Sequence, residues 1–120
     1  VNGQALPIAY QYDTETGIIK NATLVSLGTF KTTAYCPCRS CSEGYGRLTK
    51  TGTQATASRT VAVDPRVIPL GSHLLIDGVE YIAEDVGGGV KGKHIDIFYN
   101  THSETKNHGV ERSEVYLIQS

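Results

Sequence analysis

The sequence predicts a small all-β domain, folded as a barrel or a sandwich. Short runs rich in β-branched and aromatic residues alternate with Gly, Pro, Asn and Asp along the 120 residues. An Asp-Gly pair at residues 77–78 joins two such runs at the spacing of a β-hairpin. The sequence has neither a long apolar pattern of 3.6-residue period nor an internal repeat. A chain of this length holds a single core.

The N-terminal half combines an expected arm with two expected strands. Residues 1–22 are polar and irregular, with a turn at 13–17, and we expect an N-terminal arm there, outside a main domain of residues 23–120. The run TLVSLGTFKTTAY at 23–35 predicts a long strand. Residues 44–56 predict a loop, and residues 60–64 (TVAVD) a short strand that stops at Pro65.

The C-terminal half predicts a hairpin followed by two further strands. Pro69 and Gly71 mark a turn, and strands at 73–76 and 79–83 flank a type I′ turn at Asp77-Gly78. Glycines at 87–89 break the chain before a strand at 94–99. Residues 101–108 predict a short helical turn, and residues 114–118 a closing strand.

Charge and hydropathy narrow the class of partner. The formal net charge is −1 and no cluster of Lys or Arg is present, which argues against a nucleic-acid surface. No apolar stretch reaches membrane-spanning length, so we expect no membrane insertion by this segment. The composition leaves the oligomeric state open.

The glycine-rich stretch imitates two nucleotide-binding motifs. Gly87-x-Gly89-x-x-Gly92 fits the dinucleotide pattern, and Lys93 makes it close to a P-loop. Both motifs need a helix N-terminus after the glycines, whereas a strand-like run follows here. We therefore expect a tight turn with positive φ, or a loop whose backbone approaches a sugar chain closely.

Three aspartates stand at the end of a β-run or inside one. They are Asp64, Asp85 and Asp96. Since Asp is depleted from strand interiors, their recurrence suggests carboxylates gathered for acid–base cleavage of a glycosidic bond. Asp64 and Asp85 could each be ordinary turn residues. Asp96 alternates with Ile95 and Ile97, so it shares a strand face with His94 and Phe98.

The three cysteines all lie within residues 36–41 (CPCRSC), and this odd count leaves disulfide and metal interpretations open. A structural zinc ion could use Cys36, Cys38, Cys41 and either His102 or His108, although this cysteine spacing is tighter than in ordinary zinc modules. The sequence has no H-x-x-x-H pair and no G-x-S-x-G elbow. These absences argue against a catalytic zinc and against a nucleophilic enzyme.

The aspartates lie in strings that resemble a known family. VAVDPRVIPLGS at 61–72, YIAEDVGGGVKG at 81–92 and IDIF at 95–98 resemble the 3D (three-aspartate) domain of bacterial cell-wall proteins. TAYCPC at 33–38 and the closing strand extend the resemblance over about residues 32–118. That family is related to the catalytic domain of the lytic transglycosylase MltA and to RlpA-like proteins. The resemblance implies a six-stranded double-psi β-barrel.

The resemblance also implies an activity: a lytic transglycosylase that cleaves MurNAc-β-1,4-GlcNAc bonds of peptidoglycan and forms 1,6-anhydro-MurNAc. Asp96 would be the single acid/base, with Asp85 and Asp64 tuning it or positioning sugar, and neither metal nor organic cofactor is required. The implied partner is the peptidoglycan glycan strand, and the implied location is secreted, at the cell wall. The implied substrate-binding residues are Thr33, Tyr35, Thr56, Ser58, Gly88 and Lys91.

Two departures from the family pattern are visible. Arg59 follows Ser58 where related sequences often have Gly, and Ser42 follows Cys41 where they often have a second cysteine. For a secreted chain we expect one disulfide, between Cys36 and Cys41, since Cys36 and Cys38 are too close in sequence for easy bridge geometry. The alternative functions are a non-catalytic, expansin-like glycan-binding barrel and a cysteine–metal structural module.

Overall fold

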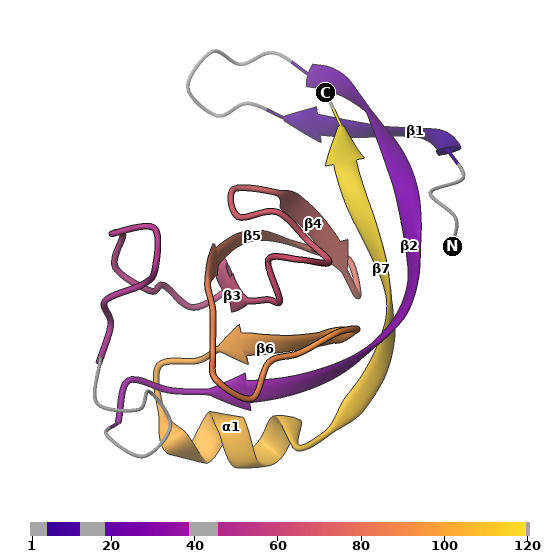
Figure 1. Ribbon diagram of the computed structural model, residues 1–120. Coiled ribbons are helices and arrows are strands. Elements are labelled where there is room, and N and C mark those ends of the chain that lie inside the picture. The colour runs from indigo at the N-terminus through magenta and orange to yellow at the C-terminus, as the bar shows by residue number, and fades with distance from the viewer. Residues whose placement is uncertain (1–4, 13–18, 39–45, 120) are drawn as a thin grey trace.

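The computed structural model describes residues 5–12, 19–38 and 46–119, with the backbone alone for 5–12 and 19–22. It confirms an all-β fold with one short helix (Figure 1). In chain order the elements are β1 (Ala5–Tyr12), β2 (Ile19–Tyr35), β3 (Thr60–Ala62), β4 (His73–Ile76), β5 (Val79–Asp85), β6 (His94–Phe98), α1 (His102–His108) and β7 (Glu111–Gln119).

Six of the strands close into a barrel, as predicted. Their order is β2-β6-β3-β5-β4-β7, and β7 pairs back with β2. The β2–β6 and β3–β5 pairs are parallel, while the other four pairs are antiparallel. Closure leaves the six strands without the exposed edges on which sheets aggregate.

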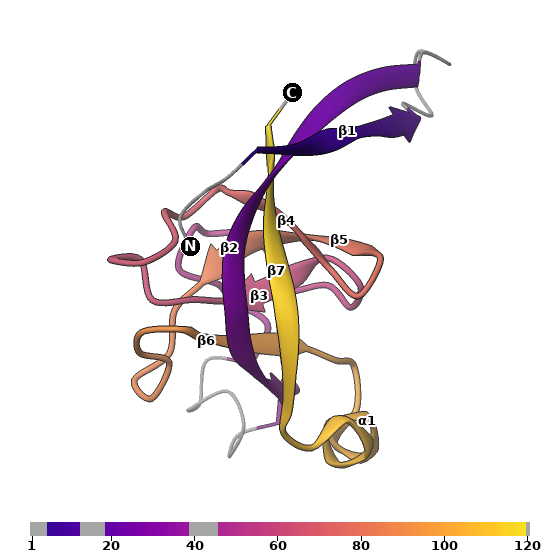
Figure 2. The same ribbon diagram turned by 90° about the vertical axis from the view of Figure 1, so that its right-hand side faces the viewer.

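The first strand was not predicted. β1 pairs antiparallel with the start of β2, from Ala5 opposite Val25 to Tyr12 opposite Ile19. The sequence predicted an irregular segment over residues 1–22, and this is wrong for residues 5–12 and 19–22, which are strand. Pro7 hid the strand, because proline removes a ladder donor. It lies at the register shift between Ala5 and Ile8, on an edge strand that tolerates proline. Figure 2 shows this two-stranded extension leaving the barrel. The turn expected at 13–17 lies outside the described residues.

Gly28 lets the 17-residue β2 serve both the extension and the barrel. It adopts φ 92° at the register shift that separates Ser26 from Gly28 in the pairing with β7. A Cβ at this position would lie 2.9 Å from Nζ of Lys93. A bulge at this glycine bends the strand so that its second half can curve around the barrel.

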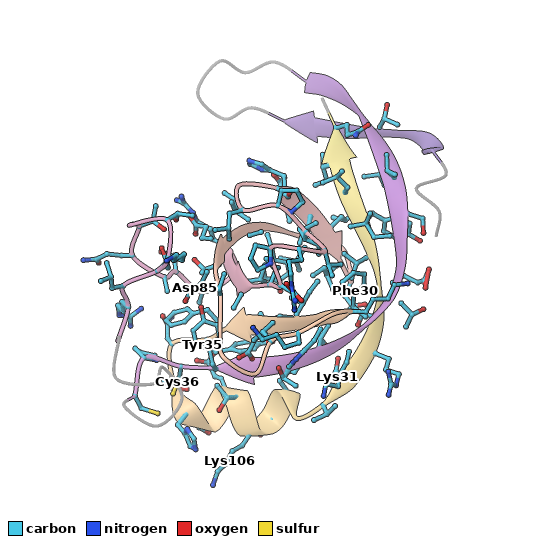
Figure 3. All side chains as sticks on the ribbon, in the orientation of Figure 1. Phe30, Lys31, Tyr35, Cys36, Asp85 and Lys106 are labelled. Atoms are coloured by element: carbon cyan, nitrogen blue, oxygen red, sulfur yellow. The ribbon has the colours of Figure 1, made fainter. Side chains whose placement is uncertain are left out.

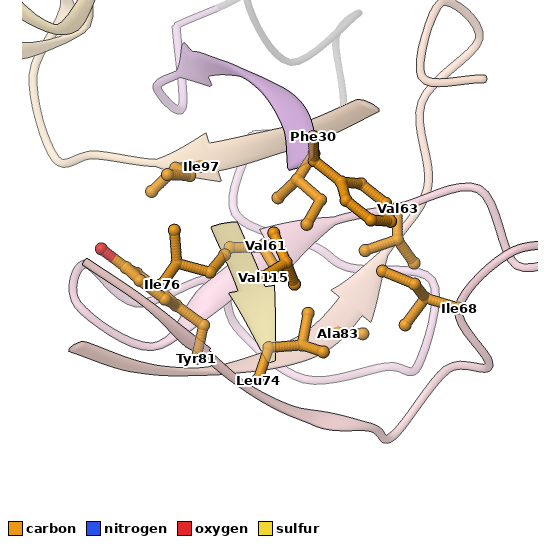
Figure 4. Packing of buried hydrophobic residues seen from close by; sticks show 11 residues of the cluster. Phe30, Val61, Val63, Ile68, Leu74, Ile76, Tyr81, Ala83, Ile97 and Val115 are labelled. Carbon is orange, nitrogen blue, oxygen red and sulfur yellow. The ribbon is translucent and has the colours of Figure 1, made fainter. Parts of the chain in front are cut away.

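The barrel interior is filled by aliphatic and aromatic side chains from all six strands and the segment after β3 (Figure 4). They are Phe30, Val61, Val63, Ile68, Leu74, Ile76, Tyr81, Ala83, Ile95, Ile97 and Val115. Strand alternation sends the intervening residues to the other face of the sheet. There a second, smaller cluster forms from Tyr35, Ala55, Ala62, Val90 and Phe98.

Two local predictions are confirmed at the ends of elements. Asp77 and Gly78 both have positive φ, 51° and 79°, as a type I′ hairpin turn requires. α1 begins after Thr101, whose hydroxyl accepts from the backbone of Glu104 while the Glu104 carboxylate accepts from the backbone of Thr101. This capping box satisfies two donors at the start of a helix of only seven residues. In the described part of the chain, no helix is long and apolar enough to cross a bilayer.

Candidate functional site

Two of the three aspartates lie in one row across four neighbouring strands. Ala62 on β3 is opposite Asp85 on one side and Asp96 on the other, and Asp96 is opposite Thr33 of β2. Residues directly opposite one another point to the same face of a sheet. The Cα atoms of Asp85 and Asp96 are thus two strand spacings apart, roughly 10 Å. The small Ala62 between them belongs to the second hydrophobic cluster.

Asp96 is half-buried and has a single hydrogen-bond donor among the described residues. The Thr33 hydroxyl donates to its Oδ1 at 2.9 Å. Burial raises the pKa of Asp96; the Thr33 hydrogen bond and the positive charges available on His94 and His108 oppose the rise, and Asp85 adds slightly to it. In the described ranges nothing donates to Oδ2. Asp96 thus combines a raised pKa with an oxygen to which no described group donates.

Thr33 links Asp96 to a histidine. Nε2 of His94 lies 2.7 Å from the Thr33 oxygen, and its Nδ1 lies 3.3 Å from the carbonyl oxygen of Gly89. The hydroxyl has one proton to donate. When Asp96 is ionised, Thr33 donates to it and accepts from His94. When Asp96 carries the proton, it can donate to Thr33, which then donates to His94. Protonation of Asp96 is therefore coupled to the histidine through one hydroxyl.

Asp85 is held by three donors at the end of β5. The Tyr35 hydroxyl donates to Oδ2 at 3.1 Å, and the backbone N–H groups of Lys50 and Val86 donate to Oδ1 at 3.0 and 2.9 Å. Tyr35 packs edge-on against Phe98, with the ring centroids 5.3 Å apart. Figure 3 shows the Tyr35 side chain beside Asp85. Burial, followed by Asp85, strongly raises the pKa of the Tyr35 phenol, which keeps it a neutral donor.

Asp64 is buried, and its carboxylate is held by hydrogen bonds within the turn after β3 and from the loop after β5. Its side chain is only 3% exposed, and Arg66 grips it with Nε on Oδ1 and Nη2 on Oδ2, both at 3.1 Å. The backbone N–H groups of Arg66 and Gly92 also donate to it, at 3.0 and 2.8 Å. The Arg66 contacts and these amides hold the pKa of Asp64 far below its usual range. Asp64 therefore ties the loop at residues 86–93 to the end of β3.

The six predicted substrate-binding residues divide into two groups. Thr33 and Tyr35 donate to the carboxylates of Asp96 and Asp85. The others are exposed, with Thr56 and Ser58 before β3 and Gly88 and Lys91 after β5. Because β3 and β5 run parallel, these two segments leave from opposite ends of the strand pair. Binding of sugar by these six residues stays a prediction.

A buried glutamate next to Asp85 was missed in the sequence. Glu84 is 3% exposed and accepts from Thr60 at 2.8 Å, from Nη2 of Arg59 at 3.0 Å and from Thr53 at 3.1 Å. Arg59, the departure from the family pattern, is thus a partner of this carboxylate. The sequence did contain a signal, which was the presence of a glutamate directly after the strand predicted at 79–83. A charged side chain that is buried in a sheet needs hydrogen-bond partners, so Glu84 could have been recognised as the centre of a polar cluster.

The structure also shows where the cysteines and the glycine-rich loop lie and what they contact. Cys36, Cys38 and His102 form the group within the described ranges whose ligand atoms could hold a metal ion. His108 instead contacts the hydroxyls of Thr32 and Tyr99, each at 3.1 Å. The glycine-rich loop leads into strand β6, as predicted, and not into the helix that both nucleotide motifs need. The predicted Cys36–Cys41 disulfide involves Cys41, which lies outside the described residues.

Comparison with known proteins places this site in a family. The model of the 3D domain matches residues 59–119, which include all three aspartates. The chain belongs to the 3D domain family. This 3D domain is 38% identical over 79 residues to the cell wall-binding protein YocH of Bacillus subtilis (strain 168). The match covers 62% of this chain and 28% of YocH, and the chain spans less than a third of the curated relatives that it matches.

Solved structures share the fold of this 3D domain. MltA from Escherichia coli superimposes with a TM-score of 0.54 at 23% identity, over 61% of this chain and 27% of MltA. The lytic transglycosylase LtgG of Burkholderia pseudomallei gives 0.52 at 23% identity, over 60% of this chain and 26% of LtgG. At such identities the likeness establishes the barrel fold alone.

Proposed function

We propose that this 3D domain acts at the bacterial cell wall as a peptidoglycan lytic transglycosylase. The observation that carries the proposal is the environment of Asp96. This carboxyl is half-buried with a raised pKa, and in the described ranges its Oδ2 accepts no hydrogen bond. A general acid needs a proton at working pH and an open atom from which to deliver it. The name of its relative YocH supports the cell wall as the location and peptidoglycan as the partner.

The proposed reaction uses Asp96 twice. Protonated Asp96 donates to the bridging oxygen as the bond between that oxygen and C1 of N-acetylmuramic acid breaks. The C6 hydroxyl of the same sugar then attacks C1, and the Asp96 carboxylate accepts the proton of that hydroxyl. A 1,6-anhydro ring forms and no water is consumed. The internal nucleophile replaces a bimolecular attack, which is a large entropic advantage.

The neighbouring groups take supporting roles in this proposal. Thr33 orients the Asp96 carboxyl and connects it to His94, which offers an exchange route for the proton. Asp85, fixed by Tyr35 and two backbone amides, presents a second carboxylate on the same face. Its role is to bind sugar hydroxyls beside the acid. Asp64 contributes through the loop that it anchors.

The weak influence of Asp85 on Asp96 supports a single-acid mechanism over one that uses a carboxylate pair. Asp85 and Asp96 stand on strands separated by β3, roughly 10 Å apart at Cα. The influence of Asp85 on the pKa of Asp96 is the weakest of those that act on it, as this separation leads one to expect.

The second candidate function is binding of cell-wall glycan without cleavage. The name of YocH specifies binding, and exposed residues such as Thr56 and Lys91 could contact glycan in either case. Incubation of the protein with purified peptidoglycan separates the candidates. We expect soluble muropeptides that end in 1,6-anhydro-muramic acid, lighter by one water than hydrolytic products and resistant to borohydride reduction. Reducing ends would instead show a hydrolase, and sedimentation with peptidoglycan without soluble product would show a binding domain.

A further inference from the structure

A group of metal-binding side chains lies at the end of β2, apart from the aspartates. Cys36 directly follows the strand, Cys38 is two residues further on, and His102 is the first residue of α1. The sulfur atoms of both cysteines lie 3.7 Å from the same atom, Nδ1 of His102. The three ligand atoms all lie within 4.8 Å of one another. Figure 3 shows Cys36 at the junction of β2 with the start of α1.

These separations fit one tetrahedral metal ion. Zn–S bonds of about 2.3 Å and Zn–N bonds of about 2.0–2.1 Å at the tetrahedral angle separate sulfur from nitrogen by roughly 3.6 Å. Both observed distances are close to this value. A hydrogen bond would account for the contact less well, because one imidazole nitrogen carries a single proton or a single lone pair, yet two sulfurs face it.

We propose that Cys36, Cys38 and His102 bind a structural Zn²⁺ ion, in place of the Cys36–Cys41 disulfide expected from the sequence. Two thiolates and an imidazole form a ligand set that suits zinc, whereas carboxylate and carbonyl oxygens suit magnesium and calcium. The fourth position belongs to water or to a group beyond these three side chains. This site is separate from the proposed chemistry, which requires no metal.

The position of the ion explains what it would do. α1 has seven residues, too few to be stable without tertiary contacts, and His102 attaches its first turn to β2. Cys36 is 1% exposed and adjoins Tyr35, the hydroxyl of which donates to Asp85. The ion would therefore fix the strand end that carries Tyr35 and would hold α1 against it.

The test is binding of Zn²⁺ alone to the reduced, metal-free protein, measured by competition with a chromophoric chelator. We expect one ion per chain and a higher Tm that a chelator reverses. Co²⁺ in its place should give a near-ultraviolet thiolate charge-transfer band and the intense visible bands of a tetrahedral site. Cys38→Ser and His102→Gln should each weaken Zn²⁺ binding more than about 100-fold, since losing even an outer partner of a metal ligand costs roughly 10–100-fold.

His73→Gln is the matched control, because His73 is an exposed histidine on β4 bonded to Glu80. It should bind Zn²⁺ as the parent protein does. His102 is exposed, so His102→Gln keeps the test valid if a cysteine variant fails to fold. Absence of binding by the folded, reduced protein would overturn the proposal, as would unchanged binding by His102→Gln. A disulfide that involves Cys36 or Cys38 in the protein as isolated would also overturn it.

Discussion

Replacement of Asp96 by Asn separates chemistry from folding at the candidate site. The Asn oxygen can still accept the hydrogen bond of 2.9 Å from Thr33. The amide nitrogen takes the place of Oδ2, to which no group in the described ranges donates, so no donor is set against another. Asn matches the shape of Asp but cannot deliver a proton. General acid–base catalysis is worth about 10²–10⁴ in rate, or about 2.7–5.5 kcal/mol of transition-state stabilisation. We expect a loss of that size.

The same substitution should not lower the stability of the fold. Burial raises the pKa of Asp96 above its value in the unfolded chain. The stabilisation that this raised pKa provides is full below the unfolded pKa and is lost as the pH rises through the folded pKa. At neutral pH the ionised carboxylate therefore opposes folding, and Asn relieves it. The Tm of Asp96→Asn at pH 7 should equal or exceed that of the parent protein, and the difference should narrow in acid.

The assay is the rate of release of soluble anhydro-muropeptides, with Tm measured on the same samples. Asp64→Asn is the comparison, because it removes the carboxylate that Arg66 and the Gly92 amide hold. Its low folded pKa gives stability that is present above the unfolded pKa and lost as the pH falls. Asp64→Asn should lower Tm at pH 7. Near-normal turnover by folded Asp96→Asn would refute the assignment of Asp96 as acid.

Three further predictions concern the surroundings of the site and the hairpin, and a fourth concerns pH. Activity should be highest in mildly acidic buffer and fall as the pH rises through the raised pKa of Asp96, measured as product release against pH. Tyr35→Phe removes a donor to Asp85 and should lower the free energy of unfolding by about 1.5–3 kcal/mol in urea titrations. Glu84→Gln replaces one acceptor oxygen, opposite three donors, with a donor amide and should cost about 1–3 kcal/mol in the same titrations. Gly78→Ala places a Cβ at φ 79° and should cost about 1–2 kcal/mol.

Matched substitutions show whether these effects have the stated causes. Glu80 is exposed and its partner His73 is half-exposed, so Glu80→Gln should change the free energy of unfolding by less than about 0.5 kcal/mol. Gly89 has no neighbour within 4 Å of an added Cβ and no positive φ, so Gly89→Ala should be tolerated. Equal losses in Gly89→Ala and Gly78→Ala would contradict the turn argument. An alkaline activity optimum would contradict a protonated Asp96.

The local elements could be predicted because their causes lie within a few residues. Asp77-Gly78 specifies its turn by accepting positive φ, and alternation around Asp96 specifies which residues face the core. β1 escaped prediction because Pro7 interrupts the strand pattern, and its tolerance there depends on an edge position that only the assembled sheet reveals. Barrel closure rests on pairings such as β2 with β6, far apart in the chain. The resemblance to a family supplied that closure, and local patterns did not.

The roles of Asp85 and Asp96 depend largely on donors that lie far from them in the sequence. Asp85 accepts hydrogen bonds from Tyr35, which is 50 residues away in the sequence, and from Lys50, which is 35 residues away. Asp96 accepts a hydrogen bond from Thr33, which is 63 residues away. Only Asp64 has its main partner nearby, in Arg66.

Three identical side chains thereby acquire different chemistry. A guanidinium and amides keep Asp64 ionised, while burial beside a single hydroxyl favours the proton on Asp96. The row of Asp85, Ala62 and Asp96 exists because β3 lies between β5 and β6 and runs parallel to one and antiparallel to the other. The candidate acid is therefore defined by strand order, and the buried Ala62, only 3% exposed, lies between the two aspartates in that row.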